Sequence, residues 1–87
     1  MKKKNRDRGF EVQEVVRTIP AREGEELCFS VVKINGKVRG DIRYFGLSED
    51  TETEGQMLPT PRGLTLDAGM VNAFRDAVKE LGAALQK

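Results

Sequence analysis

Histidine is absent from this chain of 87 residues, and cysteine occurs only once. Without histidine the usual general base near neutral pH is missing, and zinc sites of the common His/Cys type cannot form. The single Cys28 allows no internal disulfide and suits a reducing, intracellular compartment. It stands next to Leu27 and Phe29, which predicts a strand residue rather than a nucleophile. We therefore expect a protein that is not an enzyme and that uses no cofactor and no metal.

Long apolar runs and familiar catalytic motifs are missing too. No apolar segment approaches the roughly 18 residues of a membrane span, and the opening Met1-Lys2-Lys3-Lys4 is not followed by the apolar segment of a signal peptide. The nucleophile-elbow, Walker and dinucleotide-binding glycine patterns are absent. We expect no membrane association and a cytoplasmic location, associated with the nucleoid in a bacterium or nuclear in a eukaryote.

Charge is distributed unevenly, although the formal net charge is only +1. Residues 1–9 are expected to form a disordered basic tail, followed by one domain over residues 10–87. Setting aside the five Lys/Arg and one Asp of residues 1–8 leaves 10 cations against 13 anions. The tail is either a solubilising terminus or a loose phosphate contact. A nucleic-acid site in the domain must depend on where its cations lie.

Three segments have the composition of β-strands. Residues 10–19 are rich in β-branched side chains, and a slip in their alternation predicts a bulge. Residues 27–34 and 37–45 flank Asn35-Gly36, the pair typical of a two-residue type I′ hairpin turn. Such a turn pairs Ile34 with Lys37 and so fixes the register of the hairpin.

That register divides the hairpin into an apolar and a mixed face. The apolar face, which we assign to the core, carries Leu27, Phe29, Val31, Gly40, Ile42 and Tyr44. The other face, which we expect to meet solvent, carries Cys28, Ser30, Val32 and Ile34 on one strand and Lys37, Arg39, Asp41, Arg43 and Phe45 on the other. A slip of one residue would bury three cations, so the register is strongly specified.

The rest of the chain predicts a loop, a short strand and a helix. The acidic loop, residues 46–56, lacks the carboxylate spacing of a calcium loop. Pro59 and Pro61 argue against a central strand, so the fourth strand is expected only over residues 62–66. Asp67 is the expected N-cap of a helix over residues 68–85.

The apolar stripe of this helix is wide. It either covers only its own sheet or packs in addition against a second helix. Because a core this small stabilises weakly, we favour a homodimer, with an interface formed by Phe74, Val78, Leu81 and Leu85.

The mixed sheet face combines cations with flat apolar side chains. This combination is typical of surfaces that bind single-stranded nucleic acid, where cations contact phosphates and bases stack on side chains. Ordinary solvent-facing strands carry the same residue types, so the pattern alone leaves both interpretations open.

Two motifs sharpen the choice. They are N-G-K-V-R-G-D-I-R-Y-F from Asn35 and M-L-P-T-P-R-G-L-T-L from Met57, with the amphipathic helix after them. Over residues 27–85 the chain thereby resembles the transcriptional positive cofactor four family of single-stranded-DNA-binding coactivators, which has compact bacterial and phage members. The resemblance implies an α+β fold: a four-stranded curved antiparallel sheet followed by one C-terminal helix, dimerised through the helices.

Together, the mixed face and the resemblance give a set of nucleic-acid-binding residues: Ile34, Lys37, Arg39, Arg43, Phe45 and Arg62. We also expect Asp41, part of the same motif, to orient Arg43 by a hydrogen bond. Ile34 stands where the family commonly has an aromatic residue, and Leu58 and Pro61 stand where it carries further cations. These departures predict weaker, less salt-sensitive binding, unless the basic tail compensates.

We therefore expect a homodimer that binds single-stranded DNA, or RNA, with little sequence preference and acts in transcription regulation or DNA maintenance. The transcription machinery is a further candidate partner. The alternative is a protein-interaction dimer that keeps the fold but has lost nucleic-acid binding. The acidic loop and the missing cations favour that alternative.

Overall fold

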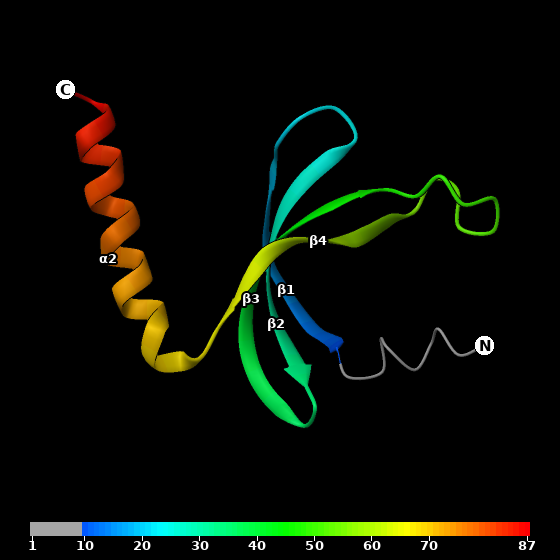
Figure 1. Cartoon of the computed structure of the whole chain (residues 1–87), viewed down its shortest axis with the longest axis horizontal. Coiled ribbons are helices and arrows are strands. Elements are labelled where there is room, and N and C mark those ends of the chain that lie inside the picture. The colour runs from blue at the N-terminus through cyan, green and yellow to red at the C-terminus, as the bar shows by residue number, and fades with distance from the viewer. Residues whose placement is uncertain (1–9) are drawn as a thin grey trace.

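The computed structural model describes residues 10–87, so the predicted basic tail, residues 1–9, lies outside the described residues. Four strands form one antiparallel sheet in the order β1-β2-β3-β4, and a single helix follows them. Figure 1 shows the helix standing beside the sheet. The predicted fold class, a four-stranded antiparallel sheet with one C-terminal helix, is confirmed. The elements are β1 (Phe10–Pro20), β2 (Glu25–Ile34), β3 (Lys37–Leu47), β4 (Met57–Leu66) and α2 (Ala68–Leu85).

The β2–β3 hairpin has the predicted turn and register. Asn35 and Gly36 both have positive φ, 51° and 83°, as a type I′ turn requires. Ile34 pairs with Lys37, and the pairing continues in step to Leu27 and Tyr44. The predicted irregularity in β1 is present as two register shifts, between Val12 and Glu14 and between Val15 and Arg17.

Strand β4 is longer than predicted. It begins at Met57 rather than Arg62 and contains both Pro59 and Pro61. The prolines are tolerated because β4 is an edge strand, where a missing N–H can face away from the sheet. The pairing of β3 with β4 shifts register between Arg43 and Phe45, which pair with Gly63 and Pro59, and this shift accommodates the proline-containing part of β4.

The sheet is strongly coiled. Phe10 pairs with Ile34, and Ile34 pairs with Lys37, so Phe10 lies level with Lys37 across the sheet. Lys37 and Arg43 are six residues apart along β3, so in a flat sheet Phe10 would lie about 20 Å or more from Arg43. Yet the Arg43 Cζ atom lies 5.5 Å from the centre of the Phe10 ring, so the start of β1 curls over the inside of the sheet. We call this inner side the concave face and the opposite side the convex face (Figure 1). By strand register, the concave face carries Phe10, Cys28, Ser30, Val32, Ile34, Lys37, Arg39, Asp41, Arg43, Phe45 and Thr65.

This coiling overturns the predicted assignment of the sheet faces. The concave face was expected to meet solvent, but it contains Val32 at 0% exposure and Asp41 at 2%, and Cys28 and Ser30 are buried beside them. Coiling brings concave side chains together, and the small Cys and Ser fit the tight interior. The convex face, predicted to be the core, is buried only at Leu66, near the start of the helix. Elsewhere its apolar residues are half-buried (Leu27, Phe29, Val31, Ile42 and Tyr44) or exposed (Val38 and Leu64).

Helix α2 begins as predicted. The Asp67 side chain caps it by accepting a hydrogen bond from the Met70 backbone N–H at 2.9 Å. Near this end Leu66 is buried, and the methyl group of Val71 lies beside Gly40.

The remainder of α2 leaves the sheet. The helix has no buried residue, and Leu81 and Leu85 are 59% and 76% exposed. Only the first turns of the stripe meet the sheet, where Val71 lies beside Gly40 and Phe74 is half-buried. Within residues 10–87 the stripe from Val78 onward is uncovered, so the helix covers little of its own sheet. Among these residues, no helix is long and apolar enough to cross a membrane.

Candidate nucleic-acid interface

A charged cluster forms the floor of the concave face. Both carboxylate oxygens of Asp41 accept hydrogen bonds from Arg43, from Nη2 at 2.9 Å and from Nε at 3.0 Å. The Thr65 hydroxyl donates to Asp41 at 3.0 Å, and Arg43 Nη1 donates to the Thr60 carbonyl at 3.0 Å. The predicted hydrogen bond from Arg43 to Asp41 is therefore present, and it is bidentate. The cluster ties β3 to β4 and holds the guanidinium in one orientation.

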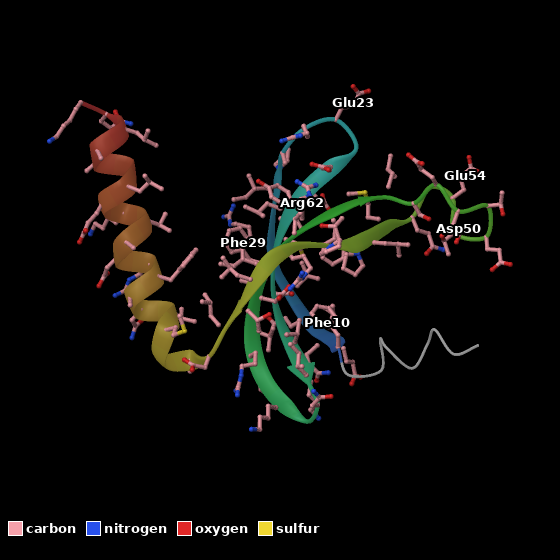
Figure 2. All side chains as sticks on the ribbon, viewed as in Figure 1. Phe10, Glu23, Phe29, Asp50, Glu54 and Arg62 are labelled. Atoms are coloured by element: carbon pink, nitrogen blue, oxygen red, sulfur yellow. The ribbon has the colours of Figure 1, made fainter. Side chains whose placement is uncertain are left out.

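Phe10 packs over this guanidinium from β1. Figure 2 shows its side chain reaching in from the blue strand toward the middle of the sheet. Because a cation over an aromatic ring is favourable, this contact joins the first strand to the third. Arg43 is left 15% exposed.

An open hollow lies where the β2–β3 hairpin ends beside the start of α2. Its volume is about 450 Å³, and it is lined by Ile34, Asn35, Lys37, Arg39, Thr65, Asp67 and Met70. The Lys37 side chain is exposed and that of Arg39 half-buried. Within residues 10–87, neither forms a salt bridge. We call this hollow, with its two cations, the hairpin hollow.

A second open hollow lies over the Arg43 guanidinium. It has a volume of about 490 Å³ and is lined by Phe10, Arg43, Leu58, Pro59 and Thr60. We call it the Phe10 hollow. Phe45 shares the concave face but does not line it; by register it stands between Glu26 and Pro59.

Arg62 is the one predicted binding residue that lies elsewhere. Its guanidinium stacks on the Tyr44 ring, 4.5 Å from the ring centre, and it forms an ion pair with Glu25. Tyr44 belongs to the convex face, so the structure separates Arg62 from Lys37, Arg39 and Arg43. A nucleic-acid contact by Arg62 stays a prediction.

Other chemistry has little support in the described part of the chain. In residues 10–87 no group of His, Cys, Asp and Glu is arranged to hold a metal ion. Burial raises the pKa of the Cys28 thiol, and the negative charges of Glu26 and Asp41 raise it further. A buried thiol held in its neutral form is a poor nucleophile.

Sequence reasoning missed Phe10, Thr60 and Thr65 as parts of this surface. Thr65 lies in the predicted fourth strand, but its place beside Asp41 depends on the register between β3 and β4, which no turn motif specifies. Phe10 could not be found, because its contact with Arg43 depends on how strongly the sheet coils. Comparisons with protein-family models, curated proteins and solved structures found no match to this chain.

Proposed function

We propose that this chain binds single-stranded nucleic acid, DNA in the first instance, through the concave face of its sheet and with little sequence preference. The main support is that four of the expected binding residues gather beside two open hollows on that face: Ile34, Lys37, Arg39 and Arg43. Proteins of this class combine cations that follow the phosphates with flat side chains that stack on bases. The resemblance to the positive cofactor four family, itself part of the proposal, agrees with this function.

The hairpin hollow is the proposed phosphate contact. Lys37 and Arg39 both point into it, and no carboxylate of residues 10–87 forms a salt bridge with them. Asp67 lines the same hollow, but its carboxylate accepts a hydrogen bond from the N-terminus of α2. Lys37 and Arg39 outnumber this one carboxylate, so the hollow keeps an excess of positive charge that attracts a phosphate backbone.

The same proposal includes a homodimer. The stripe on α2, which includes Val78, Leu81 and Leu85, is exposed, and the convex face is only half-buried. A second copy of the chain supplies an apolar surface of the same kind, and two-fold self-association is the commonest way to cover such surfaces. We place this dimer in transcription regulation or DNA maintenance, in the cytoplasm, at the nucleoid or in a nucleus.

The alternative function, a protein-interaction dimer, is supported by two features of the structure. Arg43 and Arg62 are both paired with carboxylates, and the turn between β3 and β4 exposes Glu49, Asp50, Glu52 and Glu54. These features fit a protein-interaction dimer that has lost nucleic-acid binding, in which a protein partner would cover the concave face.

The test is fluorescence anisotropy with labelled oligo-dT of about 20 nucleotides and a duplex of equal length, at several salt concentrations. We expect the single strand to bind more tightly and to weaken with salt. The double variant Lys37→Ala/Arg39→Ala should lower the slope of log affinity against log salt by about 1.4, at roughly 0.7 for each phosphate contact.

The matched control is Arg17→Ala/Lys33→Ala. It removes the same charge from the convex side of the sheet, where Arg17 and Lys33 are exposed opposite Phe29 and Val38. Its salt slope should stay that of the unmodified chain. Equal slopes for both double variants would contradict the proposed face, and absence of binding at low salt would favour the protein-interaction alternative.

A further inference from the structure

The Phe10 hollow differs chemically from the hairpin hollow. Its walls are the Phe10 ring, the Leu58 side chain and the Pro59 ring, and its polar groups come from Arg43 and Thr60. Flat apolar walls with a few fixed polar groups are the usual make-up of a small-ligand site. The hairpin hollow instead presents two cations that form no salt bridge with any side chain of residues 10–87.

The charge at the base of the Phe10 hollow is largely neutralised. The guanidinium of Arg43 lies against the Asp41 carboxylate through two hydrogen bonds, and Asp41 is buried at 2% exposure. A phosphate entering here would meet an ion pair rather than an unpaired cation. The hollow is therefore poorly suited to a phosphate and well suited to an uncharged ring.

Arg43 can supply hydrogen-bond donors to such a ring. A guanidinium has five N–H groups, and the hydrogen bonds of Arg43 within residues 10–87 use three of them, two to Asp41 and one to the Thr60 carbonyl. One N–H on Nη1 and one on Nη2 remain. Their orientation is fixed by the other three bonds, so a carbonyl or ring nitrogen at the edge of a base could accept from them without reorganisation of the site.

From these observations we propose that the Phe10 hollow is a nucleobase subsite, in which one unstacked base of a bound single strand packs on Phe10 and Pro59 and accepts a hydrogen bond from Arg43. This inference rests on the proposed function. It assigns different tasks to the two hollows: Lys37 and Arg39 contact phosphates, while Phe10 and Arg43 contact a base. It also makes Phe10, rather than Phe45, the main stacking ring of the concave face.

The chain contains no tryptophan, so a single Phe10→Trp substitution provides a local fluorescent probe. We expect saturating oligo-dT to quench its emission, because the indole would stack on a base. The control is Phe29→Trp, which places the probe on the half-buried convex face. If oligo-dT binds by anisotropy and leaves the Phe10→Trp emission unchanged, the subsite is wrong although the proposed function stands.

A second experiment removes the bases from the oligonucleotide and, separately, the Phe10 ring from the protein. Oligo-dT is compared with an abasic oligonucleotide of the same length and charge. We expect the unmodified chain to prefer oligo-dT by at least roughly 5- to 100-fold, the usual contribution of one base stacked on an aromatic side chain. Phe10→Leu should reduce this preference several-fold and keep the salt slope, because it leaves Lys37 and Arg39 intact.

The outcomes separate the two proposals. An unchanged preference for oligo-dT in Phe10→Leu would overturn the subsite alone, as would equal affinity of the unmodified chain for both oligonucleotides. Failure of the unmodified chain to bind either one at low salt would overturn the proposed function, and the subsite with it. Circular dichroism of each variant confirms that the sheet is retained.

Discussion

The two faces of the sheet are stabilised in opposite ways. The concave face is closed by its own side chains: Val32 and Asp41 are fully buried, and Arg43 is hydrogen-bonded to Asp41 and to the Thr60 carbonyl. The convex face is more apolar in composition, yet apart from Leu66 its large side chains are half-buried or exposed, and the helix beside it has no buried residue. Most of the buried side chains of the described residues therefore lie on the polar concave face, and most of the apolar convex face is left half-buried or exposed.

This difference shows that curvature, as well as composition, decides which face of a small sheet is buried. Coiling shortens distances on the inside of the sheet and lengthens them on the outside. Small residues such as Cys28 and Ser30 can then pack closely, while Leu27 and Phe29 spread apart. A buried ion pair within this inner core demands good geometry, since each charge has been removed from water.

The largest effect is expected from breaking the concave cluster. Asp41→Ala removes the partner of the Arg43 guanidinium and leaves it in a site with 15% exposure. Loss of one member of a buried pair typically costs about 3–5 kcal/mol of unfolding free energy. Urea denaturation measures this loss.

A control for that experiment is Asp50→Ala, which removes an exposed carboxylate from the loop between β3 and β4. Its unfolding free energy should change by less than about 0.5 kcal/mol. A similarly small change for Asp41→Ala would mean that the concave cluster is not the core of the chain.

An intermediate effect is expected from charging the exposed stripe of α2. Leu81→Glu places a carboxylate within the proposed dimer interface, where it would lose water without gaining a partner. We expect the dissociation constant of the dimer to rise at least about tenfold, which corresponds to roughly 1.4 kcal/mol. Analytical ultracentrifugation over a range of concentrations measures it.

Ala83→Glu is the matched control, because it adds the same charge on the opposite side of the helix. It should leave the dimer intact. A monomeric unmodified chain at all concentrations would contradict the proposed homodimer.

The smallest effect concerns the reactivity of Cys28. Its pKa is raised above the ordinary 9.0 by burial and by the nearby carboxylates of Glu26 and Asp41. Because alkylating reagents attack the thiolate, iodoacetamide at pH 8 should modify the native chain more slowly than the urea-unfolded chain. Mass spectrometry follows the reaction. Equal rates in the two states would place Cys28 outside the core.

The same shift predicts a small pH dependence of stability. Folding raises the pKa of this thiol above its value of 9.0 in the unfolded chain. The contribution of the neutral thiol to stability is therefore complete below pH 9.0 and is lost as the pH rises through the pKa of the folded state. Stability of the native chain should therefore fall above about pH 9 more steeply than that of Cys28→Ala.

Local features were predictable from the sequence. Asn35-Gly36 determined the hairpin turn, and through it the pairing of Ile34 with Lys37, because only a few residue pairs favour positive φ twice in succession. Asp67 was predictable as a cap for a similar reason, since its short carboxylate reaches the free N–H groups of the first helical turn. Each of these features is decided by residues that are neighbours in the chain.

Features that depend on the whole sheet were not predictable in this way. The contact of Phe10 with Arg43 and the burial of Val32 arise from coiling across several strands, which no local motif specifies. The placement of Arg62 follows the register shift between β3 and β4. The positions of the candidate residues within the hairpin were therefore predictable from the sequence, whereas contacts that reach other strands were not; their role in binding stays a prediction.

The proposed function requires that nucleic acid bind to the concave face. The chain has three isoleucines, which sample both faces: Ile34 lines the hairpin hollow, while Ile19 and Ile42 lie on the convex side by register. The most direct measurement is methyl NMR of isoleucine-labelled protein during titration with oligo-dT. We predict a large shift of the Ile34 methyl signal and little change at Ile42 and Ile19. Shifts at Ile42 without a shift at Ile34 would contradict the central claim.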